Sequence, residues 1–241
     1  PSWTEEMFHI FGLEPRPEAL PYEEHRKIIH PDDWDRFDAA VSRAVTEGVG
    51  YDLELRITHP DGALIYANAR CEAKKNELGE VIRLIGTTQD ITDRKLAEND
   101  LKISEKNYRT LFKNMAQGAF YQSSDGKLFN VNSAALEMFG LTYDQFVGKT
   151  SKDPQWKVVH EDGTDFPAEE HPSMVSLKTG KACRDIVAGI YNVKKNGYTW
   201  VTINSIPQFN EGEEQPYQVF VTLHDITARK QSEDLLLMQD D

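Results

Sequence analysis

The feature that most constrains the fold is an internal repeat. The hexamer Asp-Ile-Thr-Asp-Arg-Lys at 90–95 recurs with one substitution at 225–230, an offset of 135 positions. Earlier in each copy, Ile-Phe-Gly-Leu at 10–13 resembles Met-Phe-Gly-Leu at 138–141. Matched landmarks in the same order predict two copies of one folding unit. Each copy spans roughly 100 to 130 residues, the size of an ordinary domain.

Both copies end in a pattern typical of an antiparallel meander. In the first copy, residues 51–57 alternate apolar and polar side chains, as a half-buried strand does. The dipeptides Asp61-Gly62 and Asn196-Gly197 favour hairpin turns because their residues tolerate positive φ. The expected strands are 51–57, 64–71 and 81–88 in the first copy, and 185–193, 198–207 and 218–224 in the second.

Short helices are expected ahead of each meander. Residues 34–47 carry apolar side chains at helical spacing, and residues 172–179 precede Gly180, a common helix stop. The second copy adds strands at 119–123 and 127–131, after which Asn132 is typical of a helix N-cap. The order predicts an α+β fold of two domains, each an antiparallel sheet with short helices on one face. We expect three strands in the first domain, five in the second, and a connector helix between them.

These segments resemble the PAS family with its C-terminal PAC signature. The resemblance rests on Ile28–Trp34 and Gly86–Thr92 in the first copy, and on Asn132–Ala135, Val147-Gly148 and Leu223–Thr227 in the second. It implies that 1–95 is a first PAS/PAC domain, 96–115 a connector helix, 116–230 a second PAS/PAC domain, and 231–241 the start of an outgoing helix. Because Trp3 corresponds to the start of the helix after the second strand, we expect the first domain to lack its two N-terminal strands here.

The resemblance also implies a function. Tandem PAS domains of this type are cytoplasmic sensory and signal-relay segments, most often in front of a histidine kinase in a two-component system. No phosphate-binding glycine loop or nucleophile elbow occurs, so we expect this segment not to be an enzyme. Two alternatives stay open: a ligand-free dimerisation and spacer module, and a haem or flavin sensor of redox state or gas. The start without Met and the end within a helical pattern indicate a piece of a larger protein with an output domain.

Residues 93–115 contain neither Pro nor Gly, which favours one continuous helix. A weak heptad-like seam runs along it: Ala97, Leu101, Ser104, Tyr108, Leu111 and Met115. This seam predicts a homodimer through the linker helices, as a coiled coil; the alternative is a surface helix lying on the adjacent sheet. Four residues at the ends of the meanders are predicted to cap the outgoing helices and relay a signal to them: Asp90, Thr92, Asp225 and Thr227.

The candidates for a ligand pocket all lie in the second copy: Tyr121, Trp156, Met174, Tyr191, Asn204 and Thr222. The alternative is that these residues fill the core. His171 is the best haem-ligand candidate, but it precedes Pro172 and follows Glu169 and Glu170. We therefore expect a solvated histidine and a colourless protein. A flavin or a small organic ligand stays open, so the cofactor is unknown.

Composition limits the partners. The net charge of −13 argues against nucleic acid or an anionic membrane surface. No run of 18 apolar residues is present, so no membrane-spanning helix is expected. No Cys-x-x-Cys occurs, and Asp32-Asp33 is expected to cap a helix rather than bind a metal. Cys71 and Cys183 lie in different halves, which favours free thiols in a reducing cytoplasm.

Overall fold

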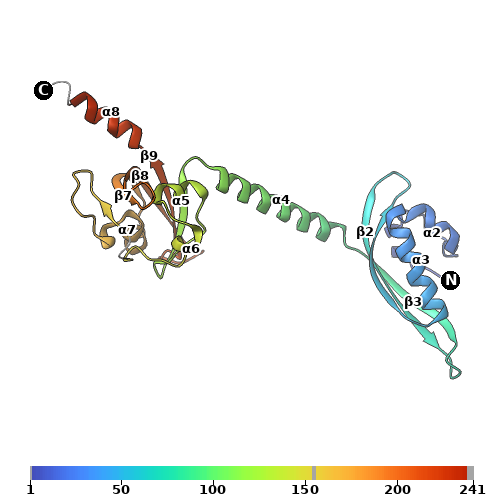
Figure 1. The fold of residues 1–241 in the computed structure, drawn as a ribbon. Coiled ribbons are helices and arrows are strands. Elements are labelled where there is room, and N and C mark those ends of the chain that lie inside the picture. The colour runs from blue at the N-terminus through green and yellow to red at the C-terminus, as the bar shows by residue number, and fades with distance from the viewer. Residues whose placement is uncertain (1, 154–155, 238–241) are drawn as a thin grey trace. The chain divides into compact units, whose positions relative to one another are not determined.

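The computed structural model describes residues 2–153 and 156–237. The chain divides into two compact units, with unit 1 ending at Ser104 and unit 2 beginning at Glu105. Each unit is built from an antiparallel sheet and short helices (Figure 1). The predicted α+β class is therefore confirmed.

Unit 1 contains three helices followed by a three-stranded meander. The helices are α1 (Glu5–Ile10), α2 (Tyr22–Ile28) and α3 (Pro31–Thr46). The strands are β1 (Tyr51–Thr58), β2 (Leu64–Lys75) and β3 (Val81–Asp90), in the order β1-β2-β3. All three strands begin where the sequence pattern predicts. Helix α3 packs across the sheet, and β3 forms one edge of it.

In its described residues, 105–153 and 156–237, unit 2 has six strands rather than the five predicted. They are β4 (Gly118–Ser123), β5 (Leu128–Phe129), β6 (Val158–Val159), β7 (Cys183–Asn192), β8 (Gly197–Gln208) and β9 (Gln218–Asp225). Their order is β5-β4-β9-β8-β7-β6. The additional strand is β6, which pairs with Ile190 and Gly189 of β7. Two residues are too few to show a period of two, so the pattern could not predict this strand.

The helices of unit 2 are short. They are α5 (Ser133–Phe139), α6 (Tyr143–Phe146), a 3₁₀ turn η1 (Ala168–Glu170) and α7 (Pro172–Thr179). Asn132 caps α5 as predicted, because its side chain accepts from the backbone N–H of Ala135 at 2.9 Å. Gly12 and Gly140, the matched glycines of the repeat, both adopt left-handed φ values, +67° and +68°.

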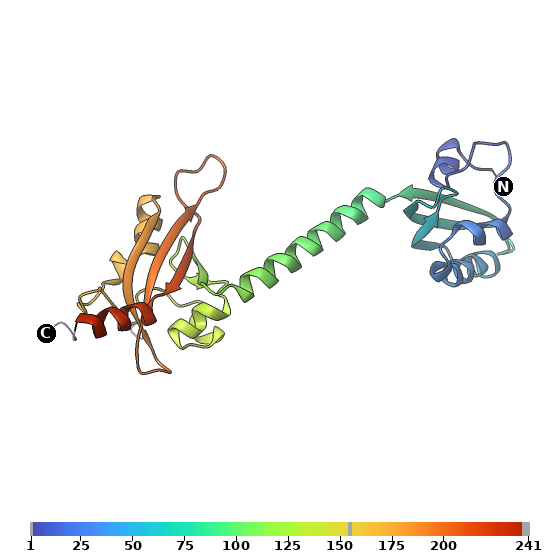
Figure 2. The ribbon, with the colours of Figure 1, turned by 90° about the horizontal axis from the view of Figure 1, so that it is seen from above.

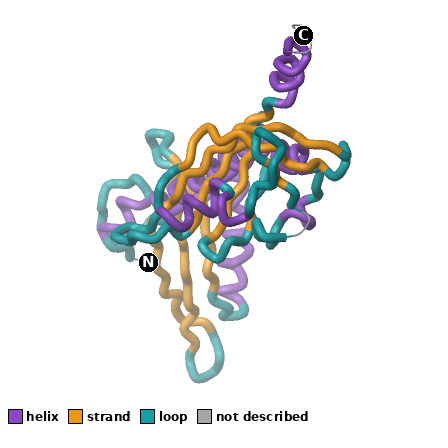
Figure 3. The backbone as a smooth tube through the Cα atoms, turned by 90° about the vertical axis from the view of Figure 1, so that its left-hand side faces the viewer, coloured by secondary structure: helices purple, strands orange, loops and turns teal. Residues whose placement is uncertain are grey.

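A long helix follows each meander. Helix α4 (Thr92–Asn114) directly follows β3, and α8 (Thr227–Leu237) directly follows β9. Figures 2 and 3 show α8 extending from the end of the sheet of unit 2. None of the helices in residues 2–153 and 156–237 is both long and apolar enough to cross a membrane.

The Asp32-Asp33 pair does not cap α3 through its side chains, which corrects that expectation. His30 is the N-cap, and its Nδ1 accepts from the N–H of Asp32 at 3.3 Å. The Asp33 carboxylate accepts instead from the backbone N–H and the Nε–H of Arg56 in β1, at 2.9 and 2.8 Å. This pair ties α3 to the sheet, and Arg56 holds the pKa of Asp33 below its usual value.

Candidate functional site

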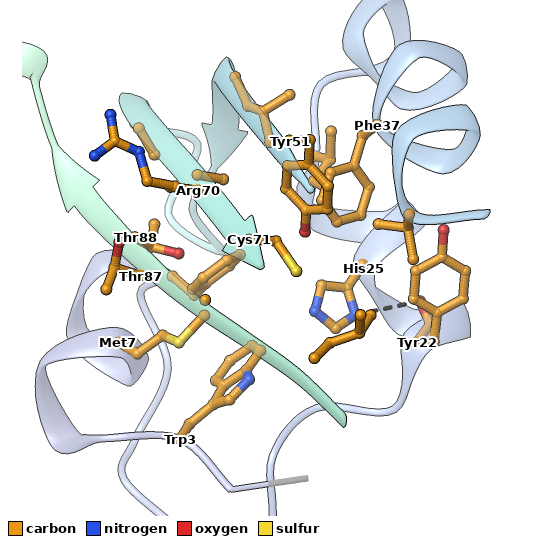
Figure 4. A pocket seen from close by; sticks show the side chains of 18 of the residues that line it. Trp3, Met7, Tyr22, His25, Phe37, Tyr51, Arg70, Cys71, Thr87 and Thr88 are labelled. Atoms are coloured by element: carbon orange, nitrogen blue, oxygen red, sulfur yellow. Dashed lines mark hydrogen bonds between the residues drawn. The ribbon is translucent and has the colours of Figure 1, made fainter. Parts of the chain in front are cut away.

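The largest cavity lies in unit 1. It has a volume of about 780 Å³, lies between the inner face of the sheet and helices α1 to α3, and is partly open to solvent (Figure 4). Its walls are largely apolar and aromatic: Trp3, Met7, Phe11, Tyr22, Ile29, Phe37 and Tyr51. A concave, mostly apolar cavity with a few polar groups is typical of a small-molecule site.

Small residues form the floor of this cavity. The two sheets can be compared position by position through the Asp residue that ends each last strand. Ala67 of β2 pairs with Asp90 in unit 1, and Val201 of β8 pairs with Asp225 in unit 2. In that register, four inward positions hold Ala67, Ala69, Gly86 and Thr88 in unit 1, and Val201, Ile203, Val221 and Leu223 in unit 2. The four residues of unit 2 are buried in a continuous core, whereas those of unit 1 line the cavity. Part of the cavity volume therefore comes from the small side chains on the inner face of the sheet.

His25 supplies a polar group to the wall. Its Nδ1 lies 3.0 Å from the carbonyl oxygen of Pro21 and 3.2 Å from that of Tyr22. Carbonyl oxygens only accept, so Nδ1 carries the proton and Nε2 is left with a free lone pair. Burial lowers the pKa of His25, against the opposing effect of these two carbonyls, so the ring is neutral at neutral pH. Figure 4 shows the second ring nitrogen turned away from Tyr22 and towards the cavity.

Four aromatic rings hold His25 in place. Its ring stacks on Phe37, with centroids 6.2 Å apart, and lies against Tyr22 at 5.8 Å. Trp3 and Phe11 meet it edge-on, at 5.5 and 6.1 Å. Such contacts fix the direction of the Nε2 lone pair.

Two further polar groups on the inner wall are also neutral, whereas the lining arginines, Arg70 and Arg83, are exposed. Cys71 is buried on β2, and burial raises the pKa of its thiol. Burial likewise raises the pKa of the Tyr51 hydroxyl, and the neighbouring Cys71 adds to this effect. The inner part of the cavity therefore offers uncharged donors and acceptors.

The two strand-to-helix junctions share one geometry. In unit 1 the backbone N–H of Thr92 donates to Asp90 Oδ1 at 2.8 Å, and that of Tyr66 donates to Thr92 Oγ1 at 3.0 Å. In unit 2 the N–H of Thr227 donates to Asp225 Oδ1 at 2.8 Å, and that of Trp200 donates to Thr227 Oγ1 at 3.0 Å. The Asp side chains therefore satisfy a free N–H at the start of each helix, and the Thr hydroxyls tie each helix to the neighbouring strand.

Ion pairs add to these ties. Glu54 of β1 contacts both Arg94 and Lys95 of α4, at 2.7 and 2.5 Å. In unit 2, Lys230 of α8 pairs with Glu161. Each outgoing helix is thus attached to its own sheet by hydrogen bonds and to its own unit by an ion pair.

The structure separates the six predicted pocket residues of unit 2. Of these, only Trp156 lines the cavity between the sheet and α7, which has a volume of about 50 Å³. Met174 lies beside it on α7, where its Sδ accepts from Gln122 Nε2 at 3.4 Å. The other four are absent from its lining: Tyr121, Tyr191, Asn204 and Thr222. Asn204 lines a separate, more open pocket of about 340 Å³.

These four residues alternate with the ones that do line the cavity. Phe120, Ile190, Ile203 and Val221 are the inward neighbours of Tyr121, Tyr191, Asn204 and Thr222, respectively. Successive residues of a strand point to opposite faces, so a shift of one position exchanges the two sets. Tyr121 instead contacts the end of α4, where its hydroxyl lies 3.4 Å from that of Tyr108. The Asn204 side chain accepts from the N–H of Asp185 at 2.9 Å.

His171 is not the solvated residue that we expected. It lines the small cavity of unit 2, and its Nε2–H donates to the carbonyl of Phe166 at 3.0 Å. Burial lowers its pKa despite the neighbouring Glu169. The reason is the fold of the preceding loop, which packs the ring of Phe166 edge-on against His171 at 5.3 Å.

The cavity of unit 1 was not predicted. A signal for it was present, since the first copy has Ala, Ala and Gly at 67, 69 and 86 where the second has Val, Ile and Val. No pattern in the sequence marks His25 as a cavity residue, because only the packing of α2 on the sheet brings it to the cavity.

Two repeated α+β domains, each with a last strand that runs directly into a long helix, define a tandem of sensory domains. Residues 1–88 match the family model described as the PAS fold, and residues 117–228 match that described as the PAS domain. The chain therefore belongs to the PAS family and carries two PAS domains, as the resemblance indicated.

Relatives of this chain include signalling proteins. It is 22% identical over 148 residues to the sensor protein FixL of Bradyrhizobium diazoefficiens, a match that covers 61% of this chain and 29% of FixL. It is 28% identical over 126 residues to the peroxide stress-activated histidine kinase mak1 of Schizosaccharomyces pombe, covering 50% of this chain and 8% of mak1. The chain thus spans less than a third of either relative.

A solved structure of a sensory box histidine kinase/response regulator from Burkholderia thailandensis is 30% identical. The match covers 46% of this chain and 82% of that chain, with a TM-score of 0.38.

Proposed function

We propose that this chain is the sensory and signal-relay part of a larger protein, in which two PAS domains regulate a downstream histidine kinase. In this proposal 1–95 and 116–230 are the two domains, 96–115 connects them, and 231–241 leads to the output. The segment itself catalyses no reaction. The relationship to a sensor protein and to a histidine kinase supports this assignment.

The observation that carries the proposal is the shared junction geometry. The hydrogen bonds of Thr92 and of Thr227 have the same partners by type and the same distances. A displacement of the central strand moves the Thr hydroxyl, and with it the first turn of the helix. A change in the sheet therefore alters the direction or the stability of the outgoing helix.

The helices are the proposed route to a partner. Leu101 and Leu111 of α4 are 62% and 70% exposed, which leaves apolar side chains for a second copy of the chain. We propose a homodimer through the linker helices. A cytoplasmic location fits two free thiols, Cys71 and Cys183, that lie in different units.

The two units differ in their capacity for a ligand. The cavity between the sheet and α7 of unit 2, of about 50 Å³, has no room for haem or flavin, which favours a colourless relay domain there. Two further pockets of unit 2, of about 340 and 410 Å³, lie elsewhere and are more open to solvent. The cavity of about 780 Å³ in unit 1 favours that unit as the sensor. The alternative of a ligand-free spacer is therefore better suited to unit 2 than to unit 1.

A chimera tests the relay. The chain is fused in helical register after α8 to the dimerisation and catalytic domains of a histidine kinase, and autophosphorylation is measured. We expect the Thr227→Val variant to change the rate at least severalfold, and Thr227→Ser to retain the parental rate because it keeps the hydroxyl. If Thr227→Val leaves the rate unchanged while hydrogen exchange shows that the junction has opened, the relay role is wrong.

A further inference from the structure

We propose that the cavity of unit 1 binds a neutral, flat ring compound whose single N–H or O–H group donates a hydrogen bond to His25 Nε2. The inference rests on the proposed sensory function and assigns its ligand by chemical class. Four properties of the cavity support it: the floor, the walls, the acceptor and the absence of buried charge among its lining residues.

The floor provides a flat surface. Ala67, Ala69 and Gly86 leave the backbone of β2 and β3 close to the cavity, where unit 2 carries branched side chains. Gly86 stays small for a local reason, because a Cβ atom there would lie only 2.8 Å from the carbonyl oxygen of Arg70. A planar molecule lying on this floor can contact the sheet over its whole face.

The walls favour rings. Trp3 stacks on Phe11, with centroids 4.8 Å apart, and Phe37 meets Tyr51 edge-on at 6.2 Å. A ring that enters between these pairs continues the same offset and edge-to-face contacts. An aliphatic chain of equal volume would fill the space without them.

The acceptor sets the orientation of the ligand. Within the described residues, no hydrogen bond reaches Nε2 of His25, while both backbone carbonyls hold the proton on Nδ1. A donor on the ligand satisfies this lone pair. His25 is half-buried, so water can reach this nitrogen in the free protein. A ligand that covers His25 without offering a donor would leave the lone pair unsatisfied, which costs binding free energy, so the site is selective for compounds that carry a donor.

The charges exclude an ionised ligand from the inner cavity. Arg70 is exposed and pairs with Asp52 on the outer side of the sheet, and Arg83 is exposed on the edge strand. Among the titratable side chains, those of His25, Tyr51 and Cys71 face the interior, and all three are uncharged at neutral pH. A carboxylate or an ammonium group would lose its hydration without gaining a partner.

Isothermal titration calorimetry of the full chain with two matched probes tests the inference. Indole is flat and apolar and carries one N–H donor, whereas N-methylindole has nearly the same shape and no donor. We expect indole to bind about tenfold more tightly, which corresponds to ~1.4 kcal/mol. Failure of both probes to bind, or equal binding of the two, would overturn the proposal.

Three variants assign the contacts. His25→Phe keeps an aromatic ring but removes the acceptor, so the two probes should bind equally. Ala69→Ile introduces the residue of unit 2 into the floor and should weaken both probes at least tenfold. Ala73→Val, farther along β2 and outside the cavity lining, adds similar bulk and should bind both probes as the parent does. A preference for indole that survives in His25→Phe would show that another group receives the donor.

Reconstitution with haem tests whether the cavity binds haem instead. An intense Soret band after reconstitution with haem that is lost in His25→Phe would overturn the assignment to a neutral organic ring. The proposed relay is tested separately, by the kinase activity of the chimera that carries the Thr227 variants. Probe binding is measured on the chain alone and does not depend on that output.

Discussion

The backbone N–H of Tyr66 donates to the hydroxyl of Thr92 at 3.0 Å and so joins the central strand of unit 1 to the first residue of α4. The same hydroxyl lies 3.5 Å from the carbonyl oxygen of Tyr66, and Ile91 N–H donates to that carbonyl at 2.8 Å. One residue of β2 is therefore bonded to two successive residues of the junction. The start of α4 cannot move without disturbing this strand.

Removal of the Thr hydroxyls should loosen the helix starts. We expect Thr92→Val and Thr227→Val each to destabilise its own unit by about 1 kcal/mol, because one hydrogen bond is lost. Hydrogen exchange measured by mass spectrometry should become faster in the first turn of α4 or α8, respectively. Thr92→Ser and Thr227→Ser keep the hydroxyl and should retain most of the protection. Equal exchange in the Val and Ser variants would contradict a tie through the hydroxyl.

Substitutions on α4 should change the state of association. The Leu101→Glu, Leu111→Glu double variant places charges on two exposed apolar positions, and we expect it to weaken a homodimer about a hundredfold or more. Sedimentation equilibrium measures the change. Lys106→Glu alters an exposed residue on the opposite side of the helix and should leave the dimer intact. A parent chain that is monomeric at all concentrations would support the alternative of a surface helix.

Gly140→Ala should destabilise unit 2 by about 3 kcal/mol. Gly140 has φ of +68°, and an added Cβ would meet the Asn192 side chain and the backbone N of Lys194. The Asn192 amide donates to the carbonyls of Glu137 and Met138 at the end of α5, at 2.7 and 3.0 Å. The clash therefore also disturbs this helix end.

The control is Gly148→Ala, since Gly148 also has positive φ but has open space around it. It should cost only about 1 kcal/mol, the backbone strain alone. Denaturation curves give the loss in the free energy of unfolding for each variant. Equal losses in the two variants would argue against the contact of the added Cβ with Asn192.

The stability of unit 2 should decrease as the pH falls below the usual pKa of histidine. Burial lowers the pKa of His171 in the folded state below its value of 6.5 in the unfolded chain. The unfolded state then binds the proton more readily, so this stability is complete above about pH 6.5 and is lost as the pH falls towards the folded pKa. Hydrogen exchange of α7, corrected for intrinsic rates, should show less protection at about pH 5 than at about pH 7.

His171→Gln keeps an N–H donor for the Phe166 carbonyl but does not titrate in this range. We expect a smaller pH effect on α7 in this variant. An unchanged pH effect would show that the loss of protection does not come from the titration of His171.

The repeat and most of the local structure can be predicted from patterns in the sequence. The strands that begin at Tyr51, Leu64 and Val81 follow from period-two alternation and from turn residues, which are local properties of the chain. Asn132 was predictable as an N-cap for the same reason, because the side chain bonds to a backbone group only three residues away. The roles of Asp90 and Asp225 as caps likewise depend on neighbours two residues along the chain.

Only the tertiary structure decided which side chains share a cavity. The alternation in β4, β7, β8 and β9 indicates two faces, but a strand with polar and aromatic residues on both faces does not reveal which one the helices cover. For this reason Tyr121, Asn204 and Thr222 were assigned to a cavity that their inward neighbours line. His25 and the small residues Ala67, Ala69 and Gly86 come together from three separate elements, and packing alone places them around one space. The conformation of the loop before α7 also brings Phe166 onto His171, whose immediate neighbours in sequence are acidic and exposed.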